Sequence, residues 1–382
     1  MPIPLWRDVR VLRVVAQIVF VAVVVLIGWW LAANMAGGLS KGKPLTFDFL
    51  QNAASFALAE SPIPYDPDQS YAYAFLVGVL NTLRVAVVGI VLASIVGLLM
   101  GIARLSTNWL VANLARGYVE ALRNTPLLIQ LFVWYFAGVL KLPRVRESIA
   151  LPGSIFLSNR GLTLPWFDPT ENFSAWLQLA VGGIVVAVIV YVLMGLWSRT
   201  ANAVPSRGFW ATFIVLLATL GSGVLMQPFV PTVPQIIGFN YTGGATLSPE
   251  YTALLFGLVV YTSAFIAEIV RAGIQSVPRG LSEASRALGL SHAQTLRLVT
   301  IPLALRVIIP PLTNQYLNLT KNSSLAAAIA YADLFYISQT ILNQSGQTLP
   351  VIVMIMAAYL TMSLAIAFVM NRVNARFKLV ER

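Results

Sequence analysis

The chain has 382 residues, of which 58% are hydrophobic and only 10% are charged. Soluble domains average ~45–50% apolar and ~25% charged residues, so this composition excludes a water-soluble fold and indicates a membrane protein. The absence of cysteine excludes disulfides, thiolate metal sites and cysteine nucleophiles. A single histidine, His292, excludes multi-histidine metal sites. We therefore expect no metal site in this chain.

Eight stretches are apolar enough to cross a bilayer core of ~30 Å as helices of ~20 residues. In chain order they cover 14–33, 75–103, 118–140, 175–197, 209–229, 251–270, 308–332 and 351–370. The seventh is interrupted by Pro310, Pro311 and Lys321. The first follows three arginines and could be a signal peptide. Its apolar run exceeds the usual ~7–15 residues of such a peptide, which favours an uncleaved helix.

The charged residues between these stretches predict the orientation. If the N-terminus is cytoplasmic and the sides alternate, Arg and Lys outnumber Asp and Glu inside, whereas acids outnumber bases outside. This positive-inside bias predicts an even number of spans with both termini in the cytoplasm. The net charge of +11 is therefore a topology signal and not a nucleic-acid patch. The outer loops 35–73 and 141–173 are either compact connections or contacts for an outer partner.

The longest cytoplasmic loop follows the sixth stretch and contains signals for a short helix. Ser282 is a suitable N-cap, Glu283 suits the positive end of the helix dipole, and Gly289 suits a left-handed stop. A helix of barely two turns is marginal alone, so it needs tertiary support or a docking partner. Ser291 can cap a second segment, which we expect Pro302 to end.

This loop resembles the hallmark of the membrane subunits of binding-protein-dependent ABC importers. The hallmark is Glu-Ala-Ala, three residues, Gly, nine residues and Ile-x-Leu-Pro. Glu283, Gly289 and Pro302 keep every spacing, and three positions, Ser285 among them, depart from it by small or isosteric changes. In that family the short helix inserts into a groove on the ATPase subunit. The resemblance implies that the coupling residues are Ser282, Glu283, Ala284, Ser285, Ala287, Leu288, Gly289 and Pro302.

A second run, from Glu120 to Gln130, is similar to the E-x-x-R-x-T-P-L-x-x-Q run of polar amino-acid permeases. The resemblance extends over about 74–140 and 251–376, and the rest of the chain lies outside the usual five-helix core. An enlarged permease of this shape resembles the general L-amino-acid uptake systems, in which two different long permeases pair.

The expected fold is an all-α polytopic membrane protein of about eight transmembrane helices. It would comprise a five-helix ABC-importer permease core, an N-terminal helix and an inserted two-helix segment. The expected parts are a cytoplasmic N-terminus with an extra helix (1–34), a periplasmic loop (35–73), the first part of the core (74–140), an insertion with outer loops and two extra helices (141–250), and the second part of the core with the coupling helix (251–382).

Polar side chains inside spans are costly and usually face a bundle interior or an aqueous cavity. Glu268 is expected near the inner interface, paired with Arg271, whereas Arg84 and Asp333 are expected near the outer boundary. Lys321 is the deepest, at a break where a restarted helix could hold a substrate carboxylate or form a hinge. The candidate pathway or gate residues are Gln130, Glu268, Asn314, Gln315, Asn318, Lys321, Asn322 and Ser324. The amides among them equally suit hydrogen bonds between helices.

A nominal Walker A spacing, Gly37 followed by Gly42 and Lys43, is not expected to bind nucleotide. Pro44 replaces the Ser or Thr that would hold Mg²⁺, and the context is a predicted outer loop. The resemblance implies no cofactor in this chain, with ATP and Mg on a dimer of separate cytosolic ABC ATPase subunits. Its other implied partners are a second homologous or identical permease, a periplasmic amino-acid-binding protein and the lipid of a bacterial inner membrane. Nucleic acid is not expected.

The function so implied is that of a non-enzymatic permease that moves amino acids, of the polar or general L-amino-acid class, inward at the expense of a partner's ATP. The alternative is an ion-coupled secondary transporter that uses the buried Lys321, Glu268 and Arg84. That class predicts an inverted internal repeat, which we do not find in the sequence. A purely structural scaffold would leave the capped inner helix unexplained.

Overall fold

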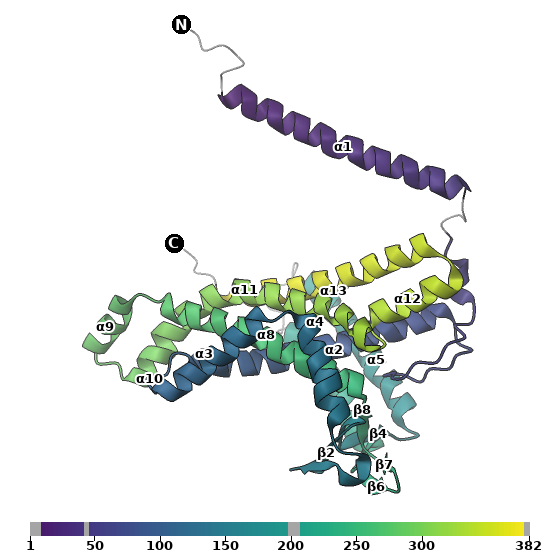
Figure 1. The fold of residues 1–382 in the computed structure, drawn as a ribbon. Helices are drawn as coiled ribbons and strands as arrows, with labels where there is room; N and C mark the ends of the chain where they lie inside the picture. The colour runs from purple at the N-terminus through teal and green to yellow at the C-terminus, as the bar shows by residue number, and fades with distance from the viewer. Residues whose placement is uncertain (1–8, 42–45, 198–206, 378–382) are drawn as a thin grey trace. The chain divides into compact units, whose positions relative to one another are not determined.

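The computed structural model describes residues 9–41, 46–197 and 207–377 (Figure 1). Within these ranges six helices are long and apolar enough to span a membrane: Tyr71–Ala103, Phe173–Gly195, Gly208–Met226, Pro249–Gln275, His292–Ile329 and Thr348–Phe377. Two shorter apolar helices, Val15–Trp30 and Leu127–Lys141, bring the apolar helical stretches to the number expected from the sequence. The chain is thus an all-α polytopic membrane protein.

The chain forms two compact units, which we describe separately. The first contains the described residues up to Val87 and from Gly273 onward, and the second is Val88–Ala272. Two long helices, α2 (Tyr71–Ala103) and α8 (Pro249–Gln275), contribute residues to both units.

In the first unit, α1 (Val9–Lys41) carries no acidic residue in its first turn, and all its described side chains are exposed. A helix that is apolar on every side requires lipid or another subunit around it. α11 (Ile301–Asn322) and α12 (Leu334–Ser345) each pack on α13 (Thr348–Phe377).

The described part of the loop before α2 is a compact connection, which is the first of the two alternatives given above for the loop 35–73. It contains the 3₁₀ turn Asp48–Gln51, and its Phe49 is buried with Tyr71 and Val77 of α2 and with Ile337 and Ile341 of α12. This apolar cluster fixes the loop against the starts of both helices.

The helices after α8 in this unit are α9 (Arg279–Ala287) and α10 (His292–Thr295), followed by the π-turn Leu296–Thr300 and α11. The expectation that Pro302 ends the segment is wrong. Pro302 lies in the first turn of α11, directly after the π-turn, and the helix runs on past it.

In the second unit, α3 (Trp109–Asn124) is capped by Asn108, whose Oδ1 accepts from the backbone N–H of Leu110 at 3.0 Å. α4 (Leu127–Phe132) follows and continues through a π-turn and a 3₁₀ turn to Lys141. The expected single span 118–140 is therefore wrong at its start. Thr125 is extended because the residue before a proline disfavours the helical conformation, so the helix breaks there.

Eight short strands, which the sequence analysis did not predict, lie in the loops of the second unit within the described residues. They are β1 (Ile149–Leu151), β2 (Ile155–Ser158), β3 (Gly161–Leu164), β4 (Trp166–Pro169), β5 (Phe229–Thr232), β6 (Gln235–Ile237), β7 (Asn240–Thr242) and β8 (Ala245–Leu247). One antiparallel sheet has the order β1-β2-β3-β8, and β4–β5 and β6–β7 form two-stranded pairs. Figure 1 shows the strands gathered in one cluster.

The two extra spans are inserted into this strand cluster. They comprise α5 (Phe173–Trp197) and α6 (Arg207–Leu216), which continues through a π-turn into α7 (Ser222–Met226). β4 precedes α5, β5 follows α7, and Asp168 pairs with Val230, so the hairpin of helices leaves and returns at the same place. The second extra span ends at Met226 and not at 229, because Gln227 adopts a left-handed conformation with φ of 43°.

Candidate coupling loop and buried polar sites

The short helix α9 begins earlier than expected. Pro278 precedes its first residue, so Ser282 lies inside the helix and its hydroxyl donates to the carbonyl of Arg279 at 2.7 Å. The expectation that Ser282 is the N-cap is therefore wrong. The reason is that Pro278, with its fixed φ, starts the helix one turn before it.

The end of α9 is as predicted. Gly289 has φ of +82°, and its N–H donates to the carbonyl of Arg286 at 2.9 Å. The N–H of Leu290 donates to the carbonyl of Ser285 at 3.1 Å. This pair of bonds is a Schellman motif, which satisfies the last carbonyls of the helix and turns the chain sharply.

One face of α9 is offered to solvent. Glu283, Ala284 and Ala287 are exposed, and Leu288 at the helix end is 83% exposed. The opposite face holds Ser285, which is buried. The exposed face of α9 therefore carries the carboxylate of Glu283 and the apolar side chain of Leu288, and other residues of the first unit leave both exposed.

Ser285 connects α9 to α10. Its hydroxyl lies 2.9 Å from the carbonyl of Ser282 and 3.1 Å from Oγ1 of Thr295, which is also buried. α10 is itself fixed by a capping box, in which Ser291 and Gln294 bond each other's backbone N–H at 3.3 and 2.8 Å. Ser291 is thus the cap that the sequence predicted, whereas the role of Thr295 was missed.

A half-buried ion cluster lies in the second unit. Glu268 is paired with Arg271 at 2.5 Å and also with Arg104. The pair with Arg271 was predicted, and the cation at 104, just beyond the end of α2, was not. A carboxylate between two guanidinium groups stays ionised, so this site holds the ends of α2 and α8 together.

Close packing beneath the ion cluster depends on two glycines of α2. A Cβ on Gly97 would lie 2.6 Å from the side chain of Ile266, and one on Gly101 would lie 2.7 Å from Val270. This Gly-x-x-x-Gly spacing lets the two backbones approach as small residues do in membrane helix pairs.

Gln130 bridges the break between α3 and α4. It is buried, and its amide N–H₂ donates to the carbonyls of Leu122 and Thr125 at 2.8 and 2.9 Å. These bonds satisfy carbonyls that the end of α3 leaves without helical partners. Of the two alternatives for this amide, the described contacts are those of a structural hydrogen bond.

A second polar cluster fixes the start of α12 in the first unit. Asp333 is buried and caps α12 by accepting from the N–H of Tyr336 at 2.8 Å. Asn81 donates to the carbonyls of Ala332 and Glu60 at 2.8 and 3.1 Å, and Thr82 accepts from the N–H of Leu334 at 3.0 Å. The adjacent polar residues Asn81 and Thr82 inside the apolar stretch 75–103 could have indicated this cluster, but the sequence analysis did not use them.

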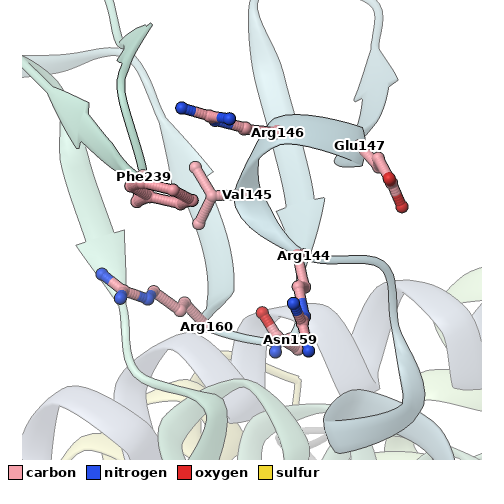
Figure 2. Close-up of a pocket in the computed structure, with 7 residues that line it drawn as sticks. All are labelled: Arg144, Val145, Arg146, Glu147, Asn159, Arg160 and Phe239. Carbon is pink, nitrogen blue, oxygen red and sulfur yellow. The ribbon is translucent and has the colours of Figure 1, made fainter.

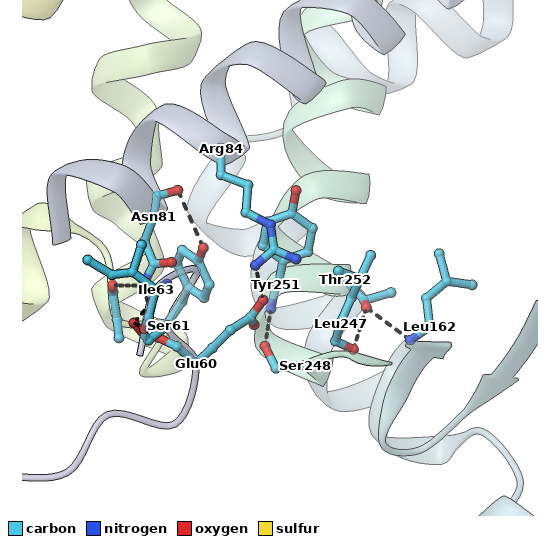
Figure 3. A network of polar contacts seen from close by, with 12 residues as sticks. Glu60, Ser61, Ile63, Asn81, Arg84, Leu162, Leu247, Ser248, Tyr251 and Thr252 are labelled. Atoms are coloured by element: carbon cyan, nitrogen blue, oxygen red, sulfur yellow. Dashed lines mark hydrogen bonds and ion pairs between the residues drawn. The ribbon is translucent and has the colours of Figure 1, made fainter. Parts of the chain in front are cut away.

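The same cluster neutralises Arg84, which forms an ion pair with Glu60 at 2.6 Å (Figure 3). Figure 3 also shows the anchor of α8 in the second unit, where the hydroxyl of Thr252 accepts from the N–H of Leu162 at 3.2 Å. The first contact attaches the loop before α2 to the body of that helix, and the second attaches β3 to the start of α8.

A helix does not restart directly after Lys321, as the carboxylate-binding alternative required. α11 continues after Asn322 as the 3₁₀ segment Ser323–Ile329, and Ser324 donates back to the carbonyl of Lys321 at 2.8 Å. The left-handed residue is Ala330, with φ of 59°, and the next helix begins at Leu334. Lys321 therefore lies in the last turn of a helix, where the dipole is negative and favours an ammonium group.

The polar residues of α11 share an exposed face. Asn314, Asn318 and Lys321 are exposed and lie three to four positions apart, whereas Gln315 is half-buried. Residues 42–44 of the Walker-like spacing lie outside the described residues.

Comparisons with known proteins agree with the sequence resemblance. Residues 197–379 match the family model described as binding-protein-dependent transport system inner membrane component. The chain is 44% identical to the general L-amino acid transport system permease protein AapQ of Rhizobium johnstonii, over 94% of this chain and 91% of that protein. It is also 44% identical to the putative amino-acid ABC transporter permease protein YhdX of Escherichia coli, over 95% of this chain and 93% of that protein.

Two further similarities extend the comparison. The glutamate/glutamine/aspartate/asparagine transport system permease protein BztB of Rhodobacter capsulatus is 38% identical, over 97% of this chain and 94% of its own length. Among solved structures, an amino acid ABC transporter with histidines is matched with a TM-score of 0.47 and 22% identity, covering 80% of this chain and 95% of that one.

Proposed function

Because the chain belongs to the family of inner membrane components of binding-protein-dependent transport systems, we propose that it couples amino-acid import to a partner's ATP hydrolysis through α9. The chain itself is a multi-pass permease of an amino-acid ABC importer. The observation that carries the coupling proposal is the exposure of α9 at the position of the family's hallmark loop, with Leu288 83% exposed at its tip.

The geometry of α9 suits a lever. The Schellman stop at Gly289 and the hydroxyl contact from Ser285 to Thr295 join α9 and α10 into one rigid piece. α10 runs through a π-turn into α11, so a displacement of α9 is passed to a membrane helix without a flexible joint. A conformational change of this kind is driven only where the partner contacts the two states differently.

The partners that follow from this proposal are a dimer of cytosolic ATPase subunits, a second homologous or identical permease and a soluble amino-acid-binding protein. The chain would lie in the bacterial inner membrane with both termini in the cytoplasm. ATP and Mg would be held by the ATPase subunits, and this chain would carry no enzymatic activity.

The described contacts disfavour the ion-coupled alternative. Glu268 is neutralised by Arg104 and Arg271, and Arg84 is neutralised by Glu60. A carboxylate that must bind and release a driving ion cannot remain held between two guanidinium groups. Lys321 remains as a group for contact with substrate or with the second permease.

The translocation path is proposed along the exposed face of α11. Asn314, Asn318 and Lys321 would be costly against lipid, so this face is expected to meet water or a polar surface of the second permease. An ammonium and two amides fit the carboxylate and amino groups that all L-amino acids share, which suits a transporter of broad specificity. Competition between labelled L-glutamate and unlabelled L-leucine or L-lysine in whole cells tests that breadth.

The coupling proposal is tested by purifying the permease with its ATPase subunits. Glu283→Lys and Leu288→Asp change the exposed face of α9 without removing an internal contact, and we expect both to abolish co-purification and uptake. The matched control is Glu171→Lys, which makes the same substitution at an exposed site in an outer loop. Unchanged co-purification of the α9 variants would contradict the proposal.

A further inference from the structure

A pocket of about 410 Å³ opens among the strands of the second unit. None of the residues that line it belongs to the coupling loop or to the ion cluster. Its wall is formed by three arginines, Arg144, Arg146 and Arg160, together with Asn159 and Phe239. Figure 2 shows Phe239 lying between the side chains of Arg146 and Arg160. The residues in its wall come from loops, from turns and from the short 3₁₀ helix Val145–Glu147.

Two of these arginines are held in place by the turn between β6 and β7. The guanidinium of Arg146 lies 4.0 Å from the centre of the Phe239 ring, and its Nε donates to the carbonyl of Gly238 at 3.0 Å. Arg160 donates to the side chain of Asn240. These contacts leave most of the guanidinium donors free while fixing where they point, which lowers the entropy cost of binding.

The positive charge of this pocket is not neutralised within the described part of the chain. None of the three arginines forms an ion pair with an aspartate or glutamate there. Glu147 also belongs to the wall, but Figure 2 shows it pointing away from Phe239 and the two arginines beside it. A guanidinium fork matches a carboxylate in a bidentate manner, so the pocket is built for carboxylates.

The surroundings of the pocket favour a protein over a free amino acid as the source of the carboxylate. Phe239 is 69% exposed and the neighbouring Ile237 is 61% exposed. Arginine and aromatic side chains beside apolar ones are the composition of the energetically dominant residues of protein interfaces. The arginines themselves are exposed, whereas a small-molecule site encloses most of its ligand.

We propose that this arginine pocket is a docking site for an acidic surface of the soluble amino-acid-binding protein. The proposal rests on the proposed function, because it places the pocket on the outer side of an importer. Two or more carboxylates of the soluble protein occupy the pocket, and an apolar side chain packs on Phe239. The strand cluster is thereby a receptor built around the two extra spans.

The test uses the complete purified assembly in nanodiscs and the binding protein of the same import system, with the dissociation constant measured at 50 and 200 mM NaCl. Arg144→Glu is the principal variant, because the Arg144 side chain makes no hydrogen bond or ion pair within the described residues that its loss could break. We expect it to weaken binding at least tenfold, with a smaller salt dependence than the wild type. Arg144→Lys is expected to weaken it less. Lys141→Glu, an equal charge change outside the pocket, is the matched control and should leave binding unchanged.

Two results would overturn the docking site. One is an unchanged dissociation constant for Arg144→Glu and for the double variant Arg146→Gln/Arg160→Gln. The other is L-glutamate binding to the wild-type assembly, but not to Arg144→Glu, with docking unaffected, which would make the pocket a small-molecule site. In either case co-purification with the ATPase subunits reports separately on the proposed function, so the two failures are distinguishable.

Discussion

The hydroxyl of Ser285 lies 3.1 Å from Oγ1 of Thr295, and both side chains are buried between α9 and α10. One of the three residues that depart from the family hallmark thus ties the exposed helix to the next. The hallmark alanine at this position could not make this bond, so this chain holds the orientation of α9 through a contact of its own.

Removal of either hydroxyl is expected to loosen α9. Thr295→Val leaves the Ser285 hydroxyl with only the carbonyl of Ser282, and a lost buried hydrogen bond costs about 1 kcal/mol. We expect faster amide exchange across 279–290 and weaker association with the ATPase subunits. A double-mutant cycle with Ser285→Ala should show that the two losses are not additive. Additive effects would mean that the two hydroxyls do not interact.

We expect replacement of Gly289 by any residue with a side chain to reduce uptake. Its φ of +82° is costly for other residues, by about 1–2 kcal/mol for L-residues in the left-handed region. Gly289→Ala should therefore unwind the end of α9 and reduce uptake, and Gly289→Asn, which tolerates this region better, should reduce it less. A Cβ at this site would meet nothing within 4 Å, so a steric explanation is excluded. Equal uptake by both variants and the wild type would contradict the role of this stop.

The sequence was sufficient where the signal was local. Gly289 and Ser291 could be assigned because a left-handed stop and a capping box depend on a few adjacent residues. The Glu268–Arg271 pair lies within one helical turn and could be found in the same way, whereas Arg104 comes from another helix and no periodicity reports it. Spacing alone locates the loop proposed for coupling, but not which of its side chains are covered.

The strand cluster was missed for a different reason. Its strands are three or four residues long, so alternation of apolar and polar residues does not extend far enough to be seen. Their pairing joins segments on both sides of the two extra spans, as at Asp168 and Val230. The start of the helix after α11 was misplaced because Asn322 and Ser324 look like caps, whereas Asp333 makes the capping contact.

The close approach of α2 and α8 predicts that Gly97 and Gly101 tolerate no larger residue. In Gly97→Val and Gly101→Val the new side chains would overlap Ile266 and Val270, and overpacking of this kind costs about 1–3 kcal/mol. We expect a lower melting temperature of the detergent-solubilised protein. Gly117→Ala in α3 is the control, because a Cβ there meets nothing within 4 Å and alanine favours a helix by about 0.5–1 kcal/mol. A melting temperature unaffected by the two valine variants would refute the packing.

The buried carboxyl of Asp333 predicts a dependence of stability on pH. It lies outside the six membrane-spanning helices, and burial raises its pKa from 3.8 to about 7, against the opposing effect of the N–H groups of Tyr336 and Phe335. Between these two pH values the folded state binds more protons at this site than the unfolded state does. Stability from this group is therefore fully present below about pH 4 and is lost as the pH rises toward 7.

Asp333→Asn separates this effect from the capping role of the side chain. Asparagine keeps an oxygen that can accept from the N–H of Tyr336 and carries no titrating proton, so the helix cap should persist. Melting temperatures of the detergent-solubilised protein at pH 5, 6, 7 and 8 should fall for the wild type and fall less for the variant. The exposed Asp48→Asn serves as the control and should follow the wild-type curve. Parallel curves for Asp333→Asn and the wild type would show that this carboxyl does not titrate in the folded protein within that range.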